Sequence, residues 1–288
     1  MKIRIISPSD QGTNHPKWWG DYWVKDDLQK EFKRRGYQIV EKDADLDFLL
    51  FGRIRELTAP RKFIWLYSHP ASVYNESWKK FIKEFEHVFV LSKQFLSIVQ
   101  KDFKNCSVLL GASSKQFTPR LVKPPYDIIF IGNTGKKLRI EILKYLIGLN
   151  KYKIGLAGTL WDDKLGGLID KVKWFGPYVD NSKLGEIFNL GHLSFYVSHE
   201  DMRQNGFVAV RVLDAFRSSE CLMIADNNPG LKDIFRNVPI FTSKEDLEIK
   251  IDSFLKYPLQ IKNLVVECRK DVLNFTFGKV VDEIEKFI

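Results

Sequence analysis

Short apolar runs rich in β-branched and aromatic residues alternate with helical patterns along almost the whole chain. In the first half the runs are Lys2–Ile6, Gln38–Val40, Asp47–Phe51, Lys62–Tyr67, His87–Leu91 and Ser107–Leu110, and helical spacing covers Asp21–Arg35 and Phe95–Phe103. Strands that alternate with helices predict parallel sheets with helices on both faces. The first half therefore predicts one Rossmann-like α/β unit.

A second series of the same kind follows a break in the periodicity. Between Ser113 and Pro125 the pattern stops and three prolines occur, a composition typical of a linker. The later runs are Asp127–Ile131, Lys153–Ala157, Val172–Phe175, Leu193–Ser198 and Cys221–Ala225, with helical segments up to Leu149 and near Leu184–Phe188. We expect two Rossmann-like α/β domains facing a cleft, residues 1–122 and 123–271, with a C-terminal helix in 272–288 packing back on the first.

Composition indicates a soluble protein. The 288 residues are 44% hydrophobic, enough for two domains with cores of their own. No uncharged apolar window reaches 18 residues, and the N-terminal strand carries charges, so neither a membrane span nor a signal peptide is expected. Three widely spaced cysteines lack metal-ligand spacing and indicate buried thiols in a reducing compartment. We therefore expect a cytoplasmic protein without a metal site.

Positive charge is concentrated in the first half. Residues 1–122 hold 21 Lys and Arg against 14 Asp and Glu, whereas residues 123–288 hold 24 against 22. A basic helix face with Lys30, Lys33, Arg34 and Arg35 could make peripheral contact with an anionic membrane or with DNA. The ordinary alternative is the solvated face of a surface helix.

A polar segment, His199–Gly206, follows one apolar run and precedes a helical pattern that ends at Phe216. In open α/β sheets, ligands bind at the carboxyl ends of strands, and a helix N-terminus favours phosphate. Arg211 and Asp214 lie three residues apart and share a helix face. A guanidinium suits a diphosphate and a carboxylate suits two ribose hydroxyls, while a surface ion pair is the alternative.

A glycine-rich basic turn opens the second domain directly after its first strand. It contains Gly132, Asn133, Thr134, Lys137 and Arg139. The turn lacks both the GxGxxG and the P-loop fingerprints. We expect it to bind phosphate, and the alternative is a solvated surface turn.

The first domain offers candidates for the acceptor side. His69 follows a predicted strand and can act as a general base near neutral pH, although a single histidine is more often structural. Asp21 opens a helix, where it can be catalytic or simply cap the helix. Trp18, Trp19 and Gly20 precede it, and the tryptophans provide aromatic platforms for an acceptor.

Four of these segments, in this order, resemble spore-maturation-protein-like glycosyltransferases (glycosyl transferases group 1) of the GT-B fold. They are Gly20-Asp21, Ser68-His69-Pro70, Gly132-Asn133-Thr134, and Asp201–Ala215 followed by Ala225–Gly230. The resemblance spans nearly the whole chain. It implies a donor site in the second domain, to which Asn205, Gly206 and Phe207 contribute together with Arg211 and Asp214.

A weaker likeness links the chain to phage DNA β-glucosyltransferases. These also have a strand followed by a glycine-containing basic turn, and an Arg-x-x-acid helix, in the second domain. In those enzymes the residue equivalent to His69 is an acidic catalytic base. The likeness therefore implies a catalytic base at position 69, although this chain has a histidine where those enzymes have an acid. Retaining GT-B enzymes have two glutamates seven residues apart, and this chain lacks that pattern. The first glutamate position falls near Asn205, and the acid Asp214 lies one residue later than the second position. Inversion is therefore favoured over retention.

Together these residues predict a glycosyltransferase that moves a sugar from a nucleotide diphosphate sugar to a hydroxyl of a glycan, a lipid-linked glycan or another acceptor. Asp214 would bind the ribose, and Arg211 with the Gly132–Arg139 turn would neutralise the diphosphate. These cations would replace a divalent metal, so no cofactor is required. His69 is the expected catalytic base, with Asp21 as its competitor.

Three other functions remain open on the sequence. The first is a DNA-modifying glycosyltransferase that acts on a hydroxylated base. The second is a nucleotide-sugar epimerase, which needs no separate acceptor and is separated by product analysis with donor alone. The third is a non-catalytic nucleic-acid-binding protein, which the salt dependence of duplex binding would reveal.

Overall fold

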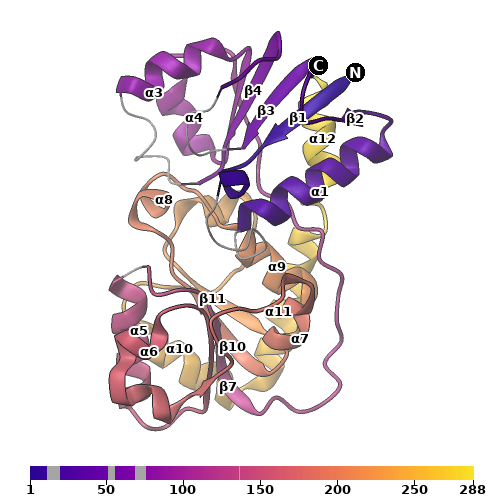
Figure 1. Cartoon of the computed structure of the whole chain (residues 1–288). Coiled ribbons are helices and arrows are strands. Elements are labelled where there is room, and N and C mark those ends of the chain that lie inside the picture. Colours follow the sequence, from indigo (N-terminus) through magenta and orange to yellow (C-terminus); the bar gives the residue numbers. More distant parts are fainter. Residues whose placement is uncertain (12–19, 51–55, 69–75, 136) are drawn as a thin grey trace. The chain divides into compact units, whose positions relative to one another are not determined.

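The computed structural model describes residues 1–11, 20–50, 56–68, 76–135 and 137–288. They form two compact units (Figure 1): residues 1–114, 200–209 and 275–288 make the first, and residues 115–199 and 210–274 make the second. Each unit contains one six-stranded sheet whose strand pairs are parallel. The predicted pair of Rossmann-like α/β domains is therefore confirmed. Trp18, Trp19 and His69 lie outside the described residues.

The first unit carries the sheet β2-β1-β3-β4-β5-β6. Its strands are β1 (Lys2–Ile6), β2 (Gln38–Ile39), β3 (Leu46–Leu50), β4 (Arg61–Leu66), β5 (His87–Val90) and β6 (Cys106–Val108). Its helices are η1 (Pro8–Gln11), α1 (Gly20–Arg34), α3 (Glu76–Phe81), η3 (Ile82–Glu84), α4 (Lys93–Val99), α8 (Glu200–Gln204) and α12 (Phe277–Glu285). Short apolar strands form the middle of this sheet because helices cover both of its faces.

A buried carboxylate inside β3 shows how the sheet accommodates a charge. Asp47 is fully buried and lies directly opposite Arg4 of β1. Arg4 donates to both carboxylate oxygens, at 2.8 and 2.7 Å, and the backbone N–H groups of Thr58 and Ala59 donate at 2.9 and 3.0 Å. Since a buried charge is tolerated only when it is paired and hydrogen-bonded, Arg4 and Asp47 are structural residues.

The core face of α1 is formed by Val24, Leu28 and Phe32. Trp23, next to Val24, is only half-buried. The helix ends before Gly36, whose φ of 90° suits a glycine after a helix C-terminus.

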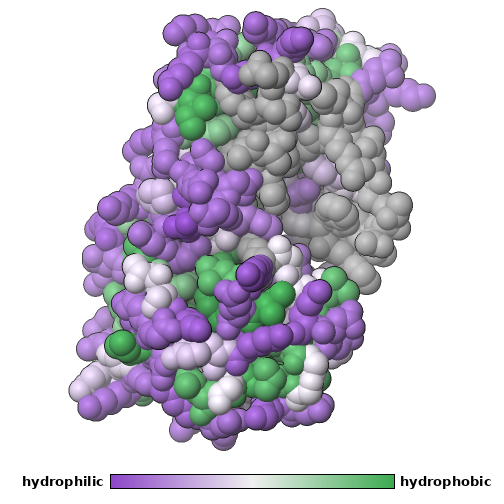
Figure 2. All heavy atoms as spheres, turned by 90° about the vertical axis from the view of Figure 1, so that its left-hand side faces the viewer, coloured by the Kyte–Doolittle hydropathy of each residue, from purple (hydrophilic) through white to green (hydrophobic). Residues whose placement is uncertain are grey.

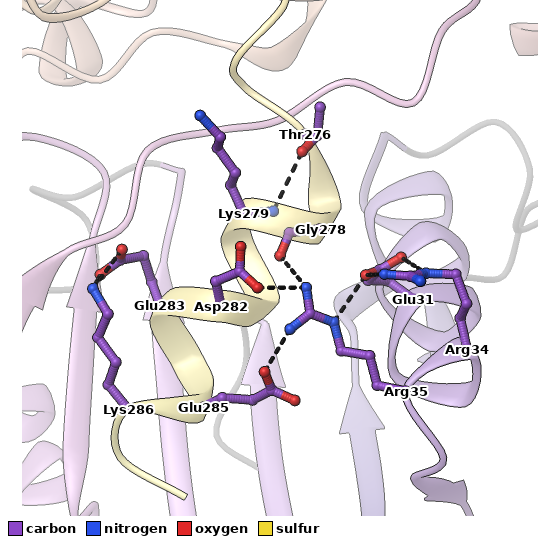
Figure 3. A network of polar contacts seen from close by, with 10 residues as sticks. All are labelled: Glu31, Arg34, Arg35, Thr276, Gly278, Lys279, Asp282, Glu283, Glu285 and Lys286. Atoms are coloured by element: carbon purple, nitrogen blue, oxygen red, sulfur yellow. Dashed lines mark hydrogen bonds and ion pairs between the residues drawn. The ribbon is translucent and has the colours of Figure 1, made fainter.

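Helix α12 is fastened to α1 by one arginine. Figure 3 shows Arg35 between the two helices, in contact with Glu31, the carbonyl of Gly278, Asp282 and Glu285, at 2.9, 2.7, 2.6 and 2.5 Å. The inner face of α12 is buried and consists of Phe277, Val280, Val281 and Ile284. The last helix is therefore part of the first unit's core.

The second unit carries the sheet β12-β11-β10-β7-β8-β9. Its strands are β7 (Tyr126–Ile131), β8 (Ile154–Ala157), β9 (Lys173–Trp174), β10 (Gly191–Tyr196), β11 (Leu222–Asp226) and β12 (Ile240–Phe241). Its helices are α5 (Lys137–Gly148), α6 (Trp161–Leu165), η4 (Gly166–Lys171), η5 (Asn181–Lys183), α7 (Leu184–Phe188), α9 (Val210–Ser218), η6 (Pro229–Asp233), α10 (Lys244–Lys256) and α11 (Pro258–Val272).

The proline-containing segment that the sequence presents as a linker is held against the second unit. The backbone N–H of Thr118 donates to Ser218 at 2.9 Å, and Arg120 donates to the carbonyl of Gly191 at 2.7 Å. Leu121 and Val122 nevertheless remain exposed. Most of the segment therefore runs along the surface of this unit without regular secondary structure.

Candidate active site

The carboxyl ends of four neighbouring strands in the second unit bring together most of the predicted donor residues. The order β11-β10-β7-β8 places the segments after Asp226, Tyr196, Ile131 and Ala157 along one edge of the sheet. Ligands of open α/β sheets bind at such an edge. The Gly132–Arg139 turn and the start of α9 therefore meet at the same edge.

Two glycines allow the segments after Ile131 and Ala157 to touch. The N–H of Gly132 donates to the carbonyl of Ala157 at 2.9 Å, and the Gly132 carbonyl accepts from the Trp161 indole at 2.7 Å. Gly158 has a φ of 139°, and a Cβ there would lie 1.9 Å from the Gly132 oxygen. Only glycine fits at 158, so the Gly132 turn keeps its position against β8.

Arg139 lies in the first turn of α5, and its guanidinium points back beneath the turn. It is 9% exposed and donates to the Asn133 carbonyl at 2.9 Å, to the Asn133 side chain at 3.2 Å and to the Val197 carbonyl at 3.2 Å. The pKa of Arg139 is lowered to about 10, mainly by burial and in part by the charge of Arg211, against opposing effects of Tyr196 and Asp226. Its Nε is buried and lacks a hydrogen-bond partner among the described residues.

Arg211 lies in the first turn of α9, on the neighbouring side of the same edge. Burial lowers its pKa, and the negative charge of Asp214 opposes that change. Its Nη1 is buried and, within the described part of the chain, has no hydrogen-bond partner. Two desolvated guanidinium groups, each with a buried nitrogen that lacks a partner among the described residues, make this edge of the sheet chemically suited to an anion.

Asp214 is the buried acid of this edge. It lies one turn after Arg211, and its carbonyl accepts from the Ser218 hydroxyl at 2.6 Å. The carboxylate also raises the pKa of Arg217 against the effect of burial. It is therefore placed among cations of α9, close to where the diphosphate would bind.

A hydrogen-bonded network fixes the segment after β10. Asp226 accepts from the backbone N–H of Ser198 at 2.7 Å and from its hydroxyl at 2.9 Å. Asn228 donates to the same hydroxyl at 3.0 Å. The sequence patterns contained Asp226 and Asn228 without assigning them a role, although a polar Asp-x-Asn directly after a buried strand was the available signal.

The other two residues predicted in the glycine-rich turn differ in accessibility. Thr134 is buried. The side chain of Lys137 is 92% exposed and forms an i,i+4 ion pair with Glu141 at 3.6 Å. Lys137 thus lies on the surface, in contrast to Arg139 in the same helical turn.

Three residues predicted for the donor site belong to the first unit. Asn205, Gly206 and Phe207 end α8, where the N–H of Phe207 donates to Met202 at 2.7 Å and Gly206 has a φ of 71°. The carbonyl of Asn205 accepts from the Ser92 hydroxyl at 2.5 Å. The ring of Phe207 is fully buried and packs edge-on against Phe95. In the described structure, these residues cap α8 and dock it on α4.

The acceptor-side candidate Asp21 lies in the first turn of α1, directly after Gly20. It accepts a hydrogen bond from the hydroxyl of Tyr67, which follows β4. Burial raises the pKa of Tyr67 well above its usual value, and the charge of Asp21 raises it further. The sequence did not single out Tyr67, because an aromatic residue at the end of an apolar strand is ordinarily a core residue.

The family model for glycosyl transferase-like proteins matches residues 139–286, just over half of the chain. This chain belongs to that family. It is a glycosyltransferase, and its two parallel sheets have the GT-B fold. The predicted family and activity are therefore confirmed, whereas the roles of individual site residues stay predictions. No curated protein sequence matches this chain significantly.

Solved structures of other glycosyltransferases share the fold at low sequence identity. The β-glucosyltransferase of phage T4, in complex with UDP and Mn²⁺, has 12% identity and a TM-score of 0.67, with 99% of each chain covered. A structure of the DNA-modifying enzyme β-glucosyltransferase has 12% identity and a TM-score of 0.69, with the same coverage. The HepE protein of Anabaena, in complex with UDP and glucose, has 10% identity and a TM-score of 0.66, with 100% of this chain and 99% of that chain covered. AviGT4, a glycosyltransferase of avilamycin A biosynthesis, has 11% identity and a TM-score of 0.63, with 99% and 96% covered.

Neither a metal-binding cluster nor a membrane-spanning helix occurs among the described residues. These residues contain no group of three or more His, Cys, Asp or Glu side chains arranged to hold a metal ion. Nor do they include a helix with the length and apolar character needed to cross a membrane.

Proposed function

We propose that this glycosyltransferase uses a uridine diphosphate sugar as donor and transfers the sugar to a hydroxyl acceptor with inversion, without a divalent metal. Glycans and lipid-linked glycans are the acceptor classes that we favour. The observation that carries the proposal is the pair of arginines, Arg139 and Arg211, at one edge of the second sheet.

The arginine pair suits a diphosphate. Burial disfavours both charges and lowers both pKa values, and repulsion from Arg211 contributes to the lowered pKa of Arg139. A bound dianion would relieve both effects and would accept hydrogen bonds from the unsatisfied Nε and Nη1 atoms. Uridine is the base we favour, because structures of the T4 enzyme and of HepE, which share the fold, contain UDP.

The neighbouring groups suit the rest of the donor. Asp214 is a carboxylate beside Arg211, which suits the two ribose hydroxyls. Gly132 has no side chain, so its backbone can approach a phosphate closely; a Cβ there would lie 3.1 Å from the Arg139 guanidinium. We assign Gly132, Asn133 and Thr134 to the phosphate side of the donor.

The chemistry follows from these assignments. The acceptor oxygen attacks the anomeric carbon, the bond from that carbon to the UDP oxygen breaks, and the acceptor proton passes to a base. The electron pair leaves with UDP, where the two guanidinium groups stabilise the added negative charge. We assign the base to His69, with Asp21 as an orienting carboxylate, and acceptor contacts to Trp18 and Trp19. A positioned base typically contributes ~10²- to 10⁴-fold in rate.

Titration calorimetry with UDP tests the donor site. Arg139→Ala, Arg211→Ala and Asp214→Ala should each weaken UDP binding, the two arginine variants by about 10- to 100-fold, because each loses charge-assisted hydrogen bonds to phosphate. Lys144→Ala is the matched control, because Lys144 is an exposed cation of the helix that carries Arg139. GDP and TDP in parallel report the preference for the base. Equal UDP affinity in all variants would remove these residues from the donor site.

Product analysis separates the remaining functions. UDP-glucose with EDTA should still release UDP, whereas activity that requires added Mn²⁺ would contradict metal independence. Conversion of the sugar without UDP release would indicate an epimerase. A hydroxylated DNA substrate tests the DNA-modifying alternative, and duplex binding without any turnover would indicate a nucleic-acid-binding protein.

Peripheral contacts through the first unit form part of the proposal. Figure 2 shows that the face of this unit formed by α3 and α4 is mainly hydrophilic, and the exposed cations Lys80, Lys83 and Lys101 lie on these helices or next to them. An anionic lipid surface or DNA is the partner that such cations suit. Vesicle sedimentation with and without anionic lipid, at two salt concentrations, tests this contact.

A further inference from the structure

The ring of Tyr67 is held rigidly at the carboxyl end of β4. The residue is 8% exposed, and its ring packs against Trp65 with centroids 5.5 Å apart. Trp65 is itself fixed, because its indole N–H donates to the Leu109 carbonyl at 3.0 Å. The hydroxyl of Tyr67 therefore has a defined position at the edge of the sheet.

That hydroxyl donates to Oδ1 of Asp21 in the first turn of α1. Asp21 is half-buried, and the positive end of a 15-residue helix favours its ionised form. The Tyr67 hydroxyl acts in the same direction, because it donates to the charged carboxylate. Since burial keeps the Tyr67 pKa high, the phenol remains a donor throughout the neutral range.

The charges nearest this pair along the chain have partners of their own. Lys25 shares the α1 face with Asp21 one turn later, and its ammonium donates to Asp10 of η1 at 2.9 Å. The other carboxylate oxygen of Asp10 accepts from the Ser7 N–H at 2.9 Å. Lys25 and Asp10 are therefore paired with each other.

We infer that Tyr67 is a positioning residue for glycosyl transfer: its hydroxyl holds the Asp21 carboxylate in the orientation that aligns the attacking hydroxyl. The inference rests on the proposed function, which assigns Asp21 to the acceptor side. If the hydrogen bond only held the end of β4 against α1, it would stabilise the fold without affecting catalysis through Asp21. The structural role and the positioning role are distinguished by whether the effects of substituting Tyr67 and Asp21 on kcat are coupled.

A double-mutant cycle tests the inference with Tyr67→Phe, Asp21→Asn and the double variant. The first keeps the ring and the charge, and the second keeps an acceptor for the Tyr67 hydroxyl while removing the charge. The assay is UDP release from UDP-glucose with water as the acceptor. We expect Tyr67→Phe to lower kcat by about 10- to 100-fold, the range for a hydrogen bond to a charged group. The double variant should be no slower than Asp21→Asn.

The pH profile adds a readout that a purely structural role would not change. Loss of the hydrogen bond from Tyr67 disfavours the ionised form of Asp21, so the acid limb of kcat should become steeper in Tyr67→Phe. The double variant should lose this steepening. A ring-fluorinated tyrosine at 67 keeps the fold and the hydroxyl but is a stronger donor, so its acid limb should not steepen. Additive losses in the cycle, or an unchanged limb in Tyr67→Phe, would overturn the inference.

Controls separate this result from the proposed function. UDP affinity should be unchanged in all three variants, because the proposed donor residues lie in the second unit. A wild type that neither binds UDP nor releases it from UDP-glucose would contradict the proposed function, and the inference with it. If the wild type turns over and Asp21→Asn does too at full rate, the role of Asp21 and the inference fail while the donor assignment stands.

Discussion

His87, at the start of β5, is a histidine that the fold keeps neutral. It is 5% exposed, its Nε2 lies 2.8 Å from the Ser107 hydroxyl, and its ring stacks on Phe287 with centroids 3.7 Å apart. Burial lowers the pKa of His87 to about 4 from the usual 6.5. A cavity of about 350 Å³ borders the same residue, lined also by Phe63, Lys104 and Cys106.

This environment predicts a pH-dependent stability. Between pH 6.5 and 4 the unfolded chain binds a proton at His87 that the folded chain does not bind. The free energy of unfolding should therefore fall as the pH falls from 6.5 through 4, by about 3 kcal/mol from this residue. Urea unfolding at several pH values measures the slope, which His87→Gln should reduce. His192, whose pKa burial also lowers, should leave a smaller slope of the same sign.

Some residues of the candidate site could be predicted from the sequence, and others could not. Arg211 and Asp214 were found because a three-residue spacing on a helix fixes a shared face. The burial of Arg139 was not foreseeable, because its guanidinium reaches the carbonyl of Val197, 58 residues away. Tyr67 was missed for the same reason, since its partner Asp21 is 46 residues distant. Contacts between separate loops depend on the packing of the whole sheet.

At the scale of elements, the best-defined junction is the one between α1 and α12 (Figure 3). Arg35 is 17% exposed and contacts three carboxylates, whereas Arg34 is 68% exposed and contacts only Glu31 among the pairs in Figure 3. Hydrogen bonds from Arg34 and Arg35 lower the pKa of Glu31 from 4.5 to about 2. The carboxylate of Glu31 is thus stabilised in its ionised form.

Arg35→Met should weaken the junction, and Arg34→Met is its matched control. Arg35→Met keeps the aliphatic stem and removes the guanidinium, so we expect a loss of about 1–2 kcal/mol in the free energy of unfolding at pH 7. Arg34→Met should leave the melting temperature almost unchanged. Arg35 provides part of the depression of the Glu31 pKa, and that part stabilises the fold above pH 4.5, so the difference between wild type and Arg35→Met should shrink as the pH falls toward 2. Equal melting temperatures for both variants at pH 7 would contradict this role.

The elements themselves were largely predictable, since local patterns determine them. Buried parallel strands appear as apolar runs, and each predicted run contains or overlaps a strand of the structure. No pattern was assigned to β12 or to α3, α6, α8, α10 and α11. Helix α8 offered no signal at all, because Glu200–Gln204 is a five-residue polar helix without an apolar stripe. Its buried contact comes from Met202 and from Phe207 after it, too few positions to form a pattern.

At the scale of the whole molecule, each unit is assembled from separate parts of the chain. The first unit takes residues 200–209 and 275–288 in addition to 1–114. The sequence placed residues 200–209 in the second domain, because one strand-to-helix connection ordinarily remains within one sheet. A strand of the second unit therefore continues into a helix of the first unit before the chain returns to α9.

This assembly predicts how fragments of the chain will behave. A fragment of residues 1–122 lacks α12, so it would expose the surface that covers Phe277, Val280, Val281 and Ile284. It would also lose Phe287, which stacks on His87. We expect this fragment to lack a cooperative thermal transition, because a domain of this size depends on most of its core.

A second fragment should restore cooperative folding. The N–H of Ser113 donates to the Phe275 carbonyl at 3.1 Å, so the end of the first segment lies beside the start of the last. A short glycine-serine linker between residues 114 and 275 can therefore join residues 1–114 to 275–288. Thermal circular dichroism should show a cooperative transition for this fusion and none for residues 1–122. A cooperative transition at the same temperature in both fragments would show that the first unit folds without α12. That result would contradict a stabilising role for the buried apolar face of this helix.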